Sequence, residues 1–261
     1  MELILLKSDY YIPIPHSYLN NTGNGSIMTI KRSFLPLAAV FIIFHTQIAL
    51  ASSSVAQTHP FPELKQGWTR VHIENVGSID LPPTMEVQGV EYKEFVDNML
   101  TSRELTVPQL AAQQKGLNEY RGPTGKYARV MVETDIGSYG DYETLDFDIS
   151  GFTKADIAEL NTATKQQVQQ SFIEGSKLGV GQVRLVEWHP VSLKKINGMS
   201  CYHLSYSRQM NANPLVIVYT YIFQNNDRLH RLIMSYRVSE AEYWEKDFAT
   251  ILKSFRITNV R

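Results

Sequence analysis

The sequence predicts an α+β protein in which an antiparallel sheet is flanked by helices. One observation is the Asn197-Gly198 pair between two alternating segments, because this pair tolerates the positive φ angles of a two-residue hairpin turn. A second is the run 215–223, which is apolar or aromatic at almost every position, as in a strand covered on both faces. A third is a stripe of apolar residues at helical spacing over 244–255. We therefore expect a meander of about four strands plus an N-terminal hairpin, with helices packed on the sheet.

The first 51 residues predict an exported chain. Lys31 and Arg32 precede the apolar run 34–44, which is too short to span a bilayer comfortably. Ala49 and Ala51 then supply the small residues of a signal-peptide cleavage site. An internal helix or a membrane anchor is the alternative interpretation of the same run. Export predicts a periplasmic or secreted protein with no membrane span after cleavage.

The position of Met28 divides the chain further, because it stands just before the basic residues of the signal peptide and is the expected start of translation. Ser52 to Gln66 is polar and contains proline, as in a disordered leader. The expected segments are an upstream extension over 1–27, the signal peptide over 28–51, the disordered leader over 52–66 and a single α+β domain over 67–261.

Composition excludes some classes of protein. Removing residues 1–51 takes away three of 25 basic and two of 26 acidic residues, so the mature chain carries a formal charge of −2. This balance offers no basic footprint for nucleic acid. Cys201 is the one cysteine, which rules out a disulfide within the chain, and at a strand position it is expected to be a small buried hydrophobe rather than a reactive thiol.

The first half of the domain predicts mostly strands. Segments 68–73 and 78–81 form the N-terminal hairpin, and 127–133 is a further strand. Segment 92–100 has weak helical periodicity. Segment 107–114 is ambiguous between helix and strand, and the turn-like residues after it favour a strand.

Capping patterns predict the beginnings of two helices. Thr153 is a favourable N-cap with Asp156 three residues further on. Ser239 and Glu242 have the spacing of a capping box ahead of the C-terminal helix. We expect both helices to pack on the sheet.

The register of the meander predicts which side chains share a face. If the turns pair Arg208 with Leu215 and Phe223 with Leu229, the strand alternation brings nine side chains together. They are Tyr202, Leu204, Tyr206, Ile217, Tyr219, Tyr221, Arg231, Ile233 and Arg237. The opposite face would carry Val216, Val218, Ile222, Leu232 and Met234, a smaller aliphatic bed for the C-terminal helix.

Tyrosine and arginine are enriched where proteins meet partners. We therefore predict a partner-binding surface at Tyr219, Tyr221, Arg231 and Arg237. The alternative is that the helix beginning at Thr153 covers this face. An error of one residue in the register would also move a strand's side chains to the opposite face.

The sequence contains no recognisable catalytic or zinc-binding motif, and no cofactor is expected. The mature histidines show no i,i+4 pair, and the glycines over 175–181 follow a helix rather than precede one, unlike a phosphate loop. The acidic residues over 133–148 have two interpretations, a calcium site or a solvated acidic loop, and their spacing matches no EF-hand.

Several elements together resemble the PsbP-like superfamily over about residues 68–258. They are the segment Ile79-Asp80-Leu81-Pro82, the helix at Thr153, the long meander and the ending FATILKSFRI over 248–257. The resemblance implies an antiparallel sheet flanked by helices and a role in binding or assembling other proteins. It brings no catalytic motif.

Three functional hypotheses follow. The first is an exported, non-catalytic protein that binds a partner protein or a small ligand in the cell envelope. The second is an envelope hydrolase whose site is assembled from distant residues. The third is a structural or stress-related accessory protein. A deep pocket with converging titratable residues would favour the enzyme, and a partly apolar sheet face would favour binding.

Overall fold

The computed structural model describes residues 62–89, 108–117, 125–142, 153–177 and 181–258. Its elements in chain order are β1 (Thr69–Ile73), β2 (Gly77–Leu81), β3 (Met85–Val87), β4 (Leu110–Gln114), β5 (Ala128–Ile136), α3 (Lys154–Lys177), β6 (Val183–Ile196), β7 (Met199–Met210), β8 (Val216–Asn225), β9 (Arg228–Arg237), the 3-10 turn η4 (Val238–Glu240), α4 (Ala241–Ser254) and β10 (Arg256–Ile257).

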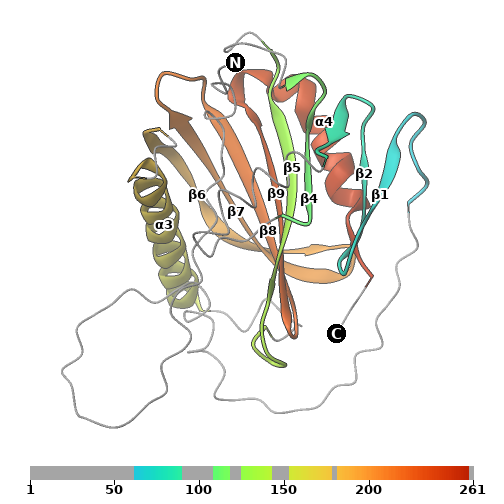
Figure 1. The fold of residues 1–261 in the computed structure, drawn as a ribbon. Coiled ribbons are helices and arrows are strands. Elements are labelled where there is room, and N and C mark those ends of the chain that lie inside the picture. The colour runs from blue at the N-terminus through green and yellow to red at the C-terminus, as the bar shows by residue number, and fades with distance from the viewer. Residues whose placement is uncertain (1–61, 90–107, 118–124, 143–152, 178–180, 259–261) are drawn as a thin grey trace, which may run out of the picture.

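The strands form two antiparallel sheets, and the predicted α+β class is confirmed. The larger sheet has the order β3-β4-β5-β9-β8-β7-β6, in which β6 to β9 make the predicted meander. The N-terminal hairpin of β1 and β2 is also confirmed, but with β10 it forms a separate small sheet. Figure 1 shows α3 beside β6 on one face of the large sheet and α4 behind the other face. The segment expected to be ambiguous near residue 110 is the strand β4.

Local chemistry explains the hairpin turn and the beginning of α3. Asn197 and Gly198 have φ values of 51° and 87°, as the predicted two-residue turn requires. Thr153 N donates to Asp156 Oδ2 at 2.9 Å, and Asp156 N donates to Thr153 Oγ1 at 3.2 Å. These reciprocal bonds confirm the predicted cap, because they satisfy backbone groups that have no partner within the helix.

The predicted capping box at Ser239 and Glu242 is wrong. Residues 238–240 form the 3-10 turn η4, and α4 begins at Ala241 without a hydrogen bond from a capping side chain. The Glu240 carboxylate is bonded elsewhere, since its Oε2 accepts from Tyr127 N at 2.9 Å and from Trp244 Nε1 at 3.0 Å. The η4 turn therefore moves the N-cap of α4 from Ser239 to Glu240, whose side chain binds Tyr127 and Trp244.

Each face of the large sheet has its own hydrophobic core. The apolar stripe of α4 is buried as predicted, with Trp244, Phe248, Ile251 and Phe255 between 0% and 4% exposed. This stripe packs with β1, β2 and the sheet side chains that include Leu232 and Met234. The opposite core joins α3 to β6, β7 and β8. The molecule is thus a sheet sandwiched between α4 with the small sheet on one side and α3 on the other.

The predicted register of β8 is wrong by one residue at both of its turns. Arg208 pairs with Val216, not Leu215, and Phe223 pairs with His230, not Leu229. The reason for the second shift is a tight turn at Asn226, whose φ is 62°. Because side chains alternate along a strand, this shift moves every β8 side chain to the face opposite the one expected.

We call the two surfaces of the large sheet the α3 face and the α4 face. The α3 face carries Tyr127, Arg129, Met131, Glu133, Tyr202, Leu204, Tyr206, Arg208, Val216, Val218, Ile222, Arg231, Ile233, Ser235 and Arg237. The α4 face carries Val130, Val132, His203, Ser205, Ile217, Tyr219, Tyr221, Leu232, Met234 and Tyr236. Of the aliphatic bed predicted for the C-terminal helix, only Leu232 and Met234 lie on the α4 face.

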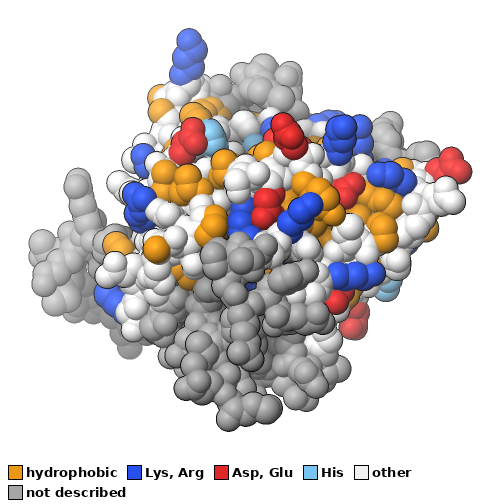
Figure 2. Space-filling model, turned by 90° about the horizontal axis from the view of Figure 1, so that it is seen from above, with side chains coloured by type: hydrophobic (Ala, Val, Ile, Leu, Met, Phe, Trp, Pro, Cys, Tyr) orange, Lys and Arg blue, Asp and Glu red, His pale blue; other side chains and the backbone are white. Residues whose placement is uncertain are grey.

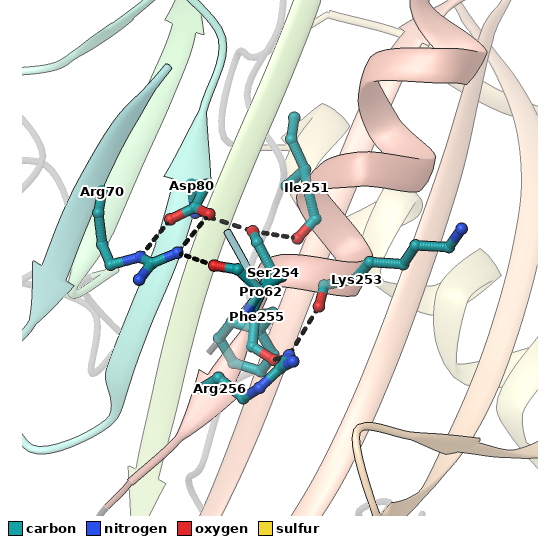
Figure 3. Close-up of polar contacts among 8 residues, drawn as sticks. All are labelled: Pro62, Arg70, Asp80, Ile251, Lys253, Ser254, Phe255 and Arg256. Atoms are coloured by element: carbon teal, nitrogen blue, oxygen red, sulfur yellow. Dashed lines mark hydrogen bonds and ion pairs between the residues drawn. The ribbon is translucent and has the colours of Figure 1, made fainter. Parts of the chain in front are cut away.

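A polar cluster joins the small sheet to the end of α4 (Figure 3). Arg70 forms two bonds to the Asp80 carboxylate at 2.7 and 2.9 Å, and Asp80 N donates to Ser254 Oγ at 2.8 Å. Burial, and secondly the charge of Arg70, lower the pKa of Arg256, whose guanidinium donates to backbone carbonyls at the end of the helix. The cluster holds β1 and β2 against α4, because Asp80 is only 3% exposed and its partners come from both elements.

Some predictions fall outside the described residues. These are the extension over 1–27, the signal peptide over 28–51, the first part of the leader and the helical segment 92–100. Residues 62–66, assigned above to the leader, touch the domain, since Arg70 Nη2 donates to Pro62 O at 2.9 Å. In the part of the chain that the structure describes, no helix is both long and apolar enough to cross a membrane.

Candidate functional site

The candidate site is a small hollow on the α3 face. In one row Tyr206, Val218, Ser235 and Arg129 lie side by side across β7, β8, β9 and β5. We call this site the Arg208 hollow, which is lined by Tyr127, Arg129, Met131, Arg208, Val218, Ile233 and Ser235. The space that it encloses is no larger than about one water molecule, and the rest of the depression is open to solvent. The site therefore combines three apolar walls with two guanidinium groups and two hydroxyl groups.

The hollow lies toward the end of the sheet where β5 begins and β9 ends. Figure 2 looks down on this end of the molecule, where Lys or Arg, Asp or Glu, and hydrophobic side chains are interspersed. Among the described side chains visible there, no broad surface carries a single charge. Any charge preference of the hollow must therefore come from the residues that line it.

Arg208 is the unusual residue of the hollow. Its position on β7 opposite Val216 points it onto the α3 face, where it is only 5% exposed. Among the described residues its guanidinium has no hydrogen-bond or ion-pair partner, although an arginine offers five N–H donors. None of its nitrogens is fully shielded from solvent, so water hydrates the guanidinium where the hollow opens.

The other arginines on this face are paired. Arg231 donates to Asp135 through two bonds of 2.7 and 2.9 Å and to Glu133 Oε2 at 3.1 Å. Arg237 Nη1 donates to Glu240 Oε1 at 3.2 Å and to Gly125 O. The Arg129 guanidinium lies 5.8 Å from the centre of the Tyr127 ring. Arg208 therefore differs from the other arginines on this face, which are held in place by their own contacts.

Hydroxyl groups complete the polar lining. Tyr127 OH lies 3.3 Å from Ser235 Oγ, and either atom can donate. Burial raises the pKa of neighbouring Tyr206 to about 12, an effect that the Arg208 charge partly opposes. Tyr206 therefore stays protonated at neutral pH and provides no anion to compensate Arg208.

The structure separates the four predicted partner-binding residues. Arg231 and Arg237 lie on the α3 face and flank the Arg208 hollow along β9, but Tyr219 and Tyr221 lie on the α4 face. The prediction that all four share one face is wrong, because of the shift in the register of β8. Arg231 and Tyr221 are also buried, at 6% and 5% exposed.

The two tyrosines belong to an aromatic group on the α4 face. Tyr219 OH lies 3.2 Å from Tyr236 OH, and the His203 ring lies 4.7 Å from that of Tyr221. His203 Nδ1 is 3.2 Å from Ser192 Oγ. Burial and the Lys194 charge lower the pKa of His203 to about 4, so the imidazole is neutral at pH 7.

The acidic segment over 133–148 does not have the geometry expected of a calcium loop where the structure describes it. Glu133 and Asp135 belong to strand β5 and bind Arg231, while Asp141 Oδ2 accepts from Ser138 N at 2.6 Å. Residues 143–148 lie outside the described ranges. No group of three or more potential metal-ligating side chains is present among the described residues.

Cys201 matches its expected structural role. The side chain is 0% exposed, and burial raises the pKa of its thiol to about 12. A thiol in this environment is protonated and unreactive at neutral pH.

Sequence reasoning missed Arg129, Tyr127 and above all Arg208. A signal was available, because Arg208 has the same strand parity as Leu204 and Tyr206 and therefore interrupts an apolar face. The strand pattern could not reveal the absence of a partner, since the neighbours of Arg208 come from three other strands.

Comparison with known proteins gives likeness in structure only. No protein-family model matches the chain. No curated protein matches it either. The chain is similar to the solution structure of cyanobacterial PsbP from Synechocystis sp., with 11% identity, a TM-score of 0.43, and coverage of 73% of this chain and 92% of the other.

Two further structures are similar to the chain. LpqN of Mycobacterium tuberculosis, described as involved in cell envelope biogenesis, has 12% identity and a TM-score of 0.37, covering 73% of this chain and 90% of LpqN. A Pseudomonas aeruginosa protein of unknown function has 9% identity and a TM-score of 0.32, with 72% and 95% coverage. These similarities concern structure alone, and no functional residue is carried over from them.

Proposed function

We propose that the chain is an exported, non-catalytic protein of the cell envelope that binds a small ligand in the Arg208 hollow. Export is the expectation from the signal-peptide pattern over 28–51. The observation that carries the binding role is Arg208, a residue 5% exposed that lines a shallow, partly open hollow and has no hydrogen-bond or ion-pair partner among the described residues. Its N–H donors are therefore available to a ligand at the mouth of the hollow.

The composition of the hollow supports this role. Small-ligand sites are commonly concave and apolar with a few polar groups that orient the ligand. Met131, Val218 and Ile233 provide apolar walls here, and Arg208 and Ser235 provide polar groups. The hollow is built on paired strands rather than loops, so its groups are held in place before a ligand arrives.

Native mass spectrometry tests the proposal. The chain would be expressed with its leader, purified from the envelope fraction and sprayed without denaturant, beside the variants Arg208→Met and Arg184→Met. We expect the wild-type chain to carry an additional small mass, Arg208→Met to lose it, and Arg184→Met to keep it, because Arg184 is exposed and contacts Gln209. A wild-type chain that carries no added mass, and whose melting temperature does not change with an envelope metabolite extract, would contradict the proposal.

A hydrolase is the second candidate, and one contact favours it. Ser192 Oγ lies 3.2 Å from His203 Nδ1, the arrangement in which an imidazole activates a hydroxyl nucleophile. With a pKa lowered to about 4, however, His203 is a weak base at neutral pH. If this pair were catalytic, the wild-type chain would hydrolyse p-nitrophenyl esters and Ser192→Ala would not. Equal rates of ester hydrolysis by the wild type and Ser192→Ala would exclude a hydrolase that uses this pair.

A further inference from the structure

The turn between β6 and β7 contains a chemically labile pair of residues. Asn197-Gly198 is the one Asn-Gly pair after residue 51. Asparagine is labile because the backbone nitrogen of the next residue can attack the carbon of its side-chain amide. Glycine hinders this attack least, since it carries no Cβ and leaves the backbone free to rotate. The pair is therefore reactive by composition, and the fold determines whether the attacking atom is accessible and what the reaction changes.

The fold leaves the attacking nitrogen accessible. Ile196 and Met199 are the last cross-strand pair of the hairpin, so Asn197 and Gly198 alone form its loop. In such a loop the turn hydrogen bond joins the two residues that flank the central pair. The Gly198 N–H has no acceptor among the described residues, and Gly198 is exposed. Water and hydroxide therefore reach the nitrogen that has to lose its proton.

The side-chain amide of Asn197 connects this turn to the end of α4. Its Nδ2 donates to Phe255 O at 2.6 Å and lies 3.5 Å from Leu252 O. Arg256 Nη1 donates to the same Phe255 oxygen at 3.0 Å. Both acceptors are carbonyl groups at the C-terminal end of the helix, which carries a partial negative charge. The connection therefore requires a donor at position 197, which an amide provides and a carboxylate does not.

We propose that Asn197 is a site of spontaneous deamidation in the folded chain, and that the reaction separates the β6–β7 hairpin from α4. The Gly198 nitrogen forms a bond to Asn197 Cγ, the bond from Cγ to Nδ2 breaks, and Nδ2 leaves as ammonia with the proton of the Gly198 N–H. Water then opens the cyclic imide at either of its carbonyl groups and yields aspartate or isoaspartate. Neither product retains the Nδ2 donor, so the bond to Phe255 O cannot form again.

The two products have different effects on the turn. Aspartate places a carboxylate beside carbonyl oxygens at the negative end of the helix dipole, where the Arg256 guanidinium can compensate part of the charge. Isoaspartate directs the main chain through the side-chain carbon and so adds a backbone atom to the loop. The pairing of Ile196 with Met199 across a two-residue loop does not accommodate that atom. Isoaspartate is therefore the more destabilising product.

Peptide mapping by mass spectrometry tests the proposal on the purified mature chain, kept folded at mildly alkaline pH. Deamidation exchanges NH₂ for OH, and the aspartate and isoaspartate peptides elute separately. We expect Asn197 to convert before any other asparagine. Asn226 is the matched control, because it also has a positive φ, of 62°, in a turn but is followed by Asp227. The converted chain, isolated by ion exchange, should melt at a lower temperature than the unconverted chain, and its isoaspartate form below an Asn197→Asp variant.

Three outcomes would overturn the proposal. If Asn197 converts in urea but remains an amide in the folded chain, the fold protects the residue and it is not a native modification site. Conversion of Asn226 as fast as that of Asn197 would show that the glycine is irrelevant. A converted chain whose melting temperature equals that of the unconverted chain would show that the reaction does not separate the hairpin from α4.

Discussion

Arg208 and Arg231 are buried to a similar extent on the same sheet face, yet their surroundings predict different contributions to stability. Arg231 is 6% exposed and has two carboxylate partners, whereas Arg208 is 5% exposed and has none among the described residues. Losing a paired buried charge is destabilising because its partner is left buried, whereas losing an arginine without a partner leaves no such group behind. The same residue type is therefore structural at one position and available for binding at the other.

We predict that Arg208→Met changes the free energy of unfolding of the ligand-free chain by less than about 1 kcal/mol, because the substitution breaks no hydrogen bond or ion pair among the described residues and the guanidinium nitrogens reach solvent. Arg231→Met should lower that free energy by about 3 to 5 kcal/mol, because it leaves Glu133 and Asp135 buried without a cation. Urea unfolding followed by circular dichroism measures both. A loss of stability in Arg208→Met as large as that in Arg231→Met would show that Arg208 has a structural partner.

A second prediction at the residue scale concerns pH. His230 is 0% exposed and lies between Thr134 Oγ1 at 2.9 Å and Asn225 Nδ2 at 3.3 Å. Burial, and secondly the Arg228 charge, lower the pKa of His230 from 6.5 to about 4. The unfolded chain therefore binds a proton at a higher pH than the native chain. Stability is complete above pH 6.5 and falls as the pH decreases toward 4, by at most about 3 kcal/mol for this residue.

Urea titrations at pH 7, 6, 5 and 4.5 check this dependence, with His230→Gln as the variant that cannot titrate. The variant should lose less stability between pH 7 and pH 4.5 than the wild type. His203, with its pKa also lowered to about 4, should supply part of the remaining slope. A ring pKa near 6.5 for His230, measured by NMR in the folded chain, would contradict the prediction.

At the scale of elements, the turn between β6 and β7 has two separate roles. Its backbone reverses the chain with Asn197 at a φ of 51°. Its side chain reaches the end of α4, since Asn197 Nδ2 donates to Phe255 O at 2.6 Å. The tip of the β6–β7 hairpin is thus hydrogen-bonded to the end of α4.

Two substitutions at this position separate the roles. Asn197→Gly keeps the positive φ and removes only the side-chain bond, so it should lower the free energy of unfolding by about 1 kcal/mol. Asn197→Pro fixes φ near about −65°, which the turn cannot accept, and should cost about 3 kcal/mol or more. Thermal or urea unfolding compares the two variants. Equal losses would mean that the side-chain bond, not the turn conformation, determines the effect.

At the scale of the whole molecule, export determines the compartment in which the protein encounters any ligand. We predict that the signal peptide is cleaved after Ala51, with Ala56 as the less favoured site. Fractionation of the expressing cells, followed by N-terminal sequencing of the mature protein, shows whether the chain is exported and at which site it is cleaved. A chain that retains Lys31 and Arg32 and stays in the cytoplasmic fraction would contradict export, without affecting the expected binding to the Arg208 hollow.

Patterns that depend on neighbours in the chain were predictable from the sequence. The Asn197 turn, the cap between Thr153 and Asp156 and the buried stripe of α4 each depend on the conformational preference or spacing of a few consecutive residues. The alternation of the meander strands is equally local, so the α+β class and the strand order of β6 to β9 followed from it. Two of the predicted partner-binding residues, Arg231 and Arg237, also lie beside the hollow.

The register of β8, and with it the candidate site, was decided only by the tertiary structure. A strand with apolar side chains on both faces fits its neighbours in either register, so the turn geometry at Asn226 selects one of them. Glu240 stands at the N-cap of α4 but its side chain binds Tyr127 and Trp244, and Arg231 binds Glu133 and Asp135 of the neighbouring strand. Such contacts between groups far apart in the sequence leave no local pattern, because which partners meet depends on how the strands pair.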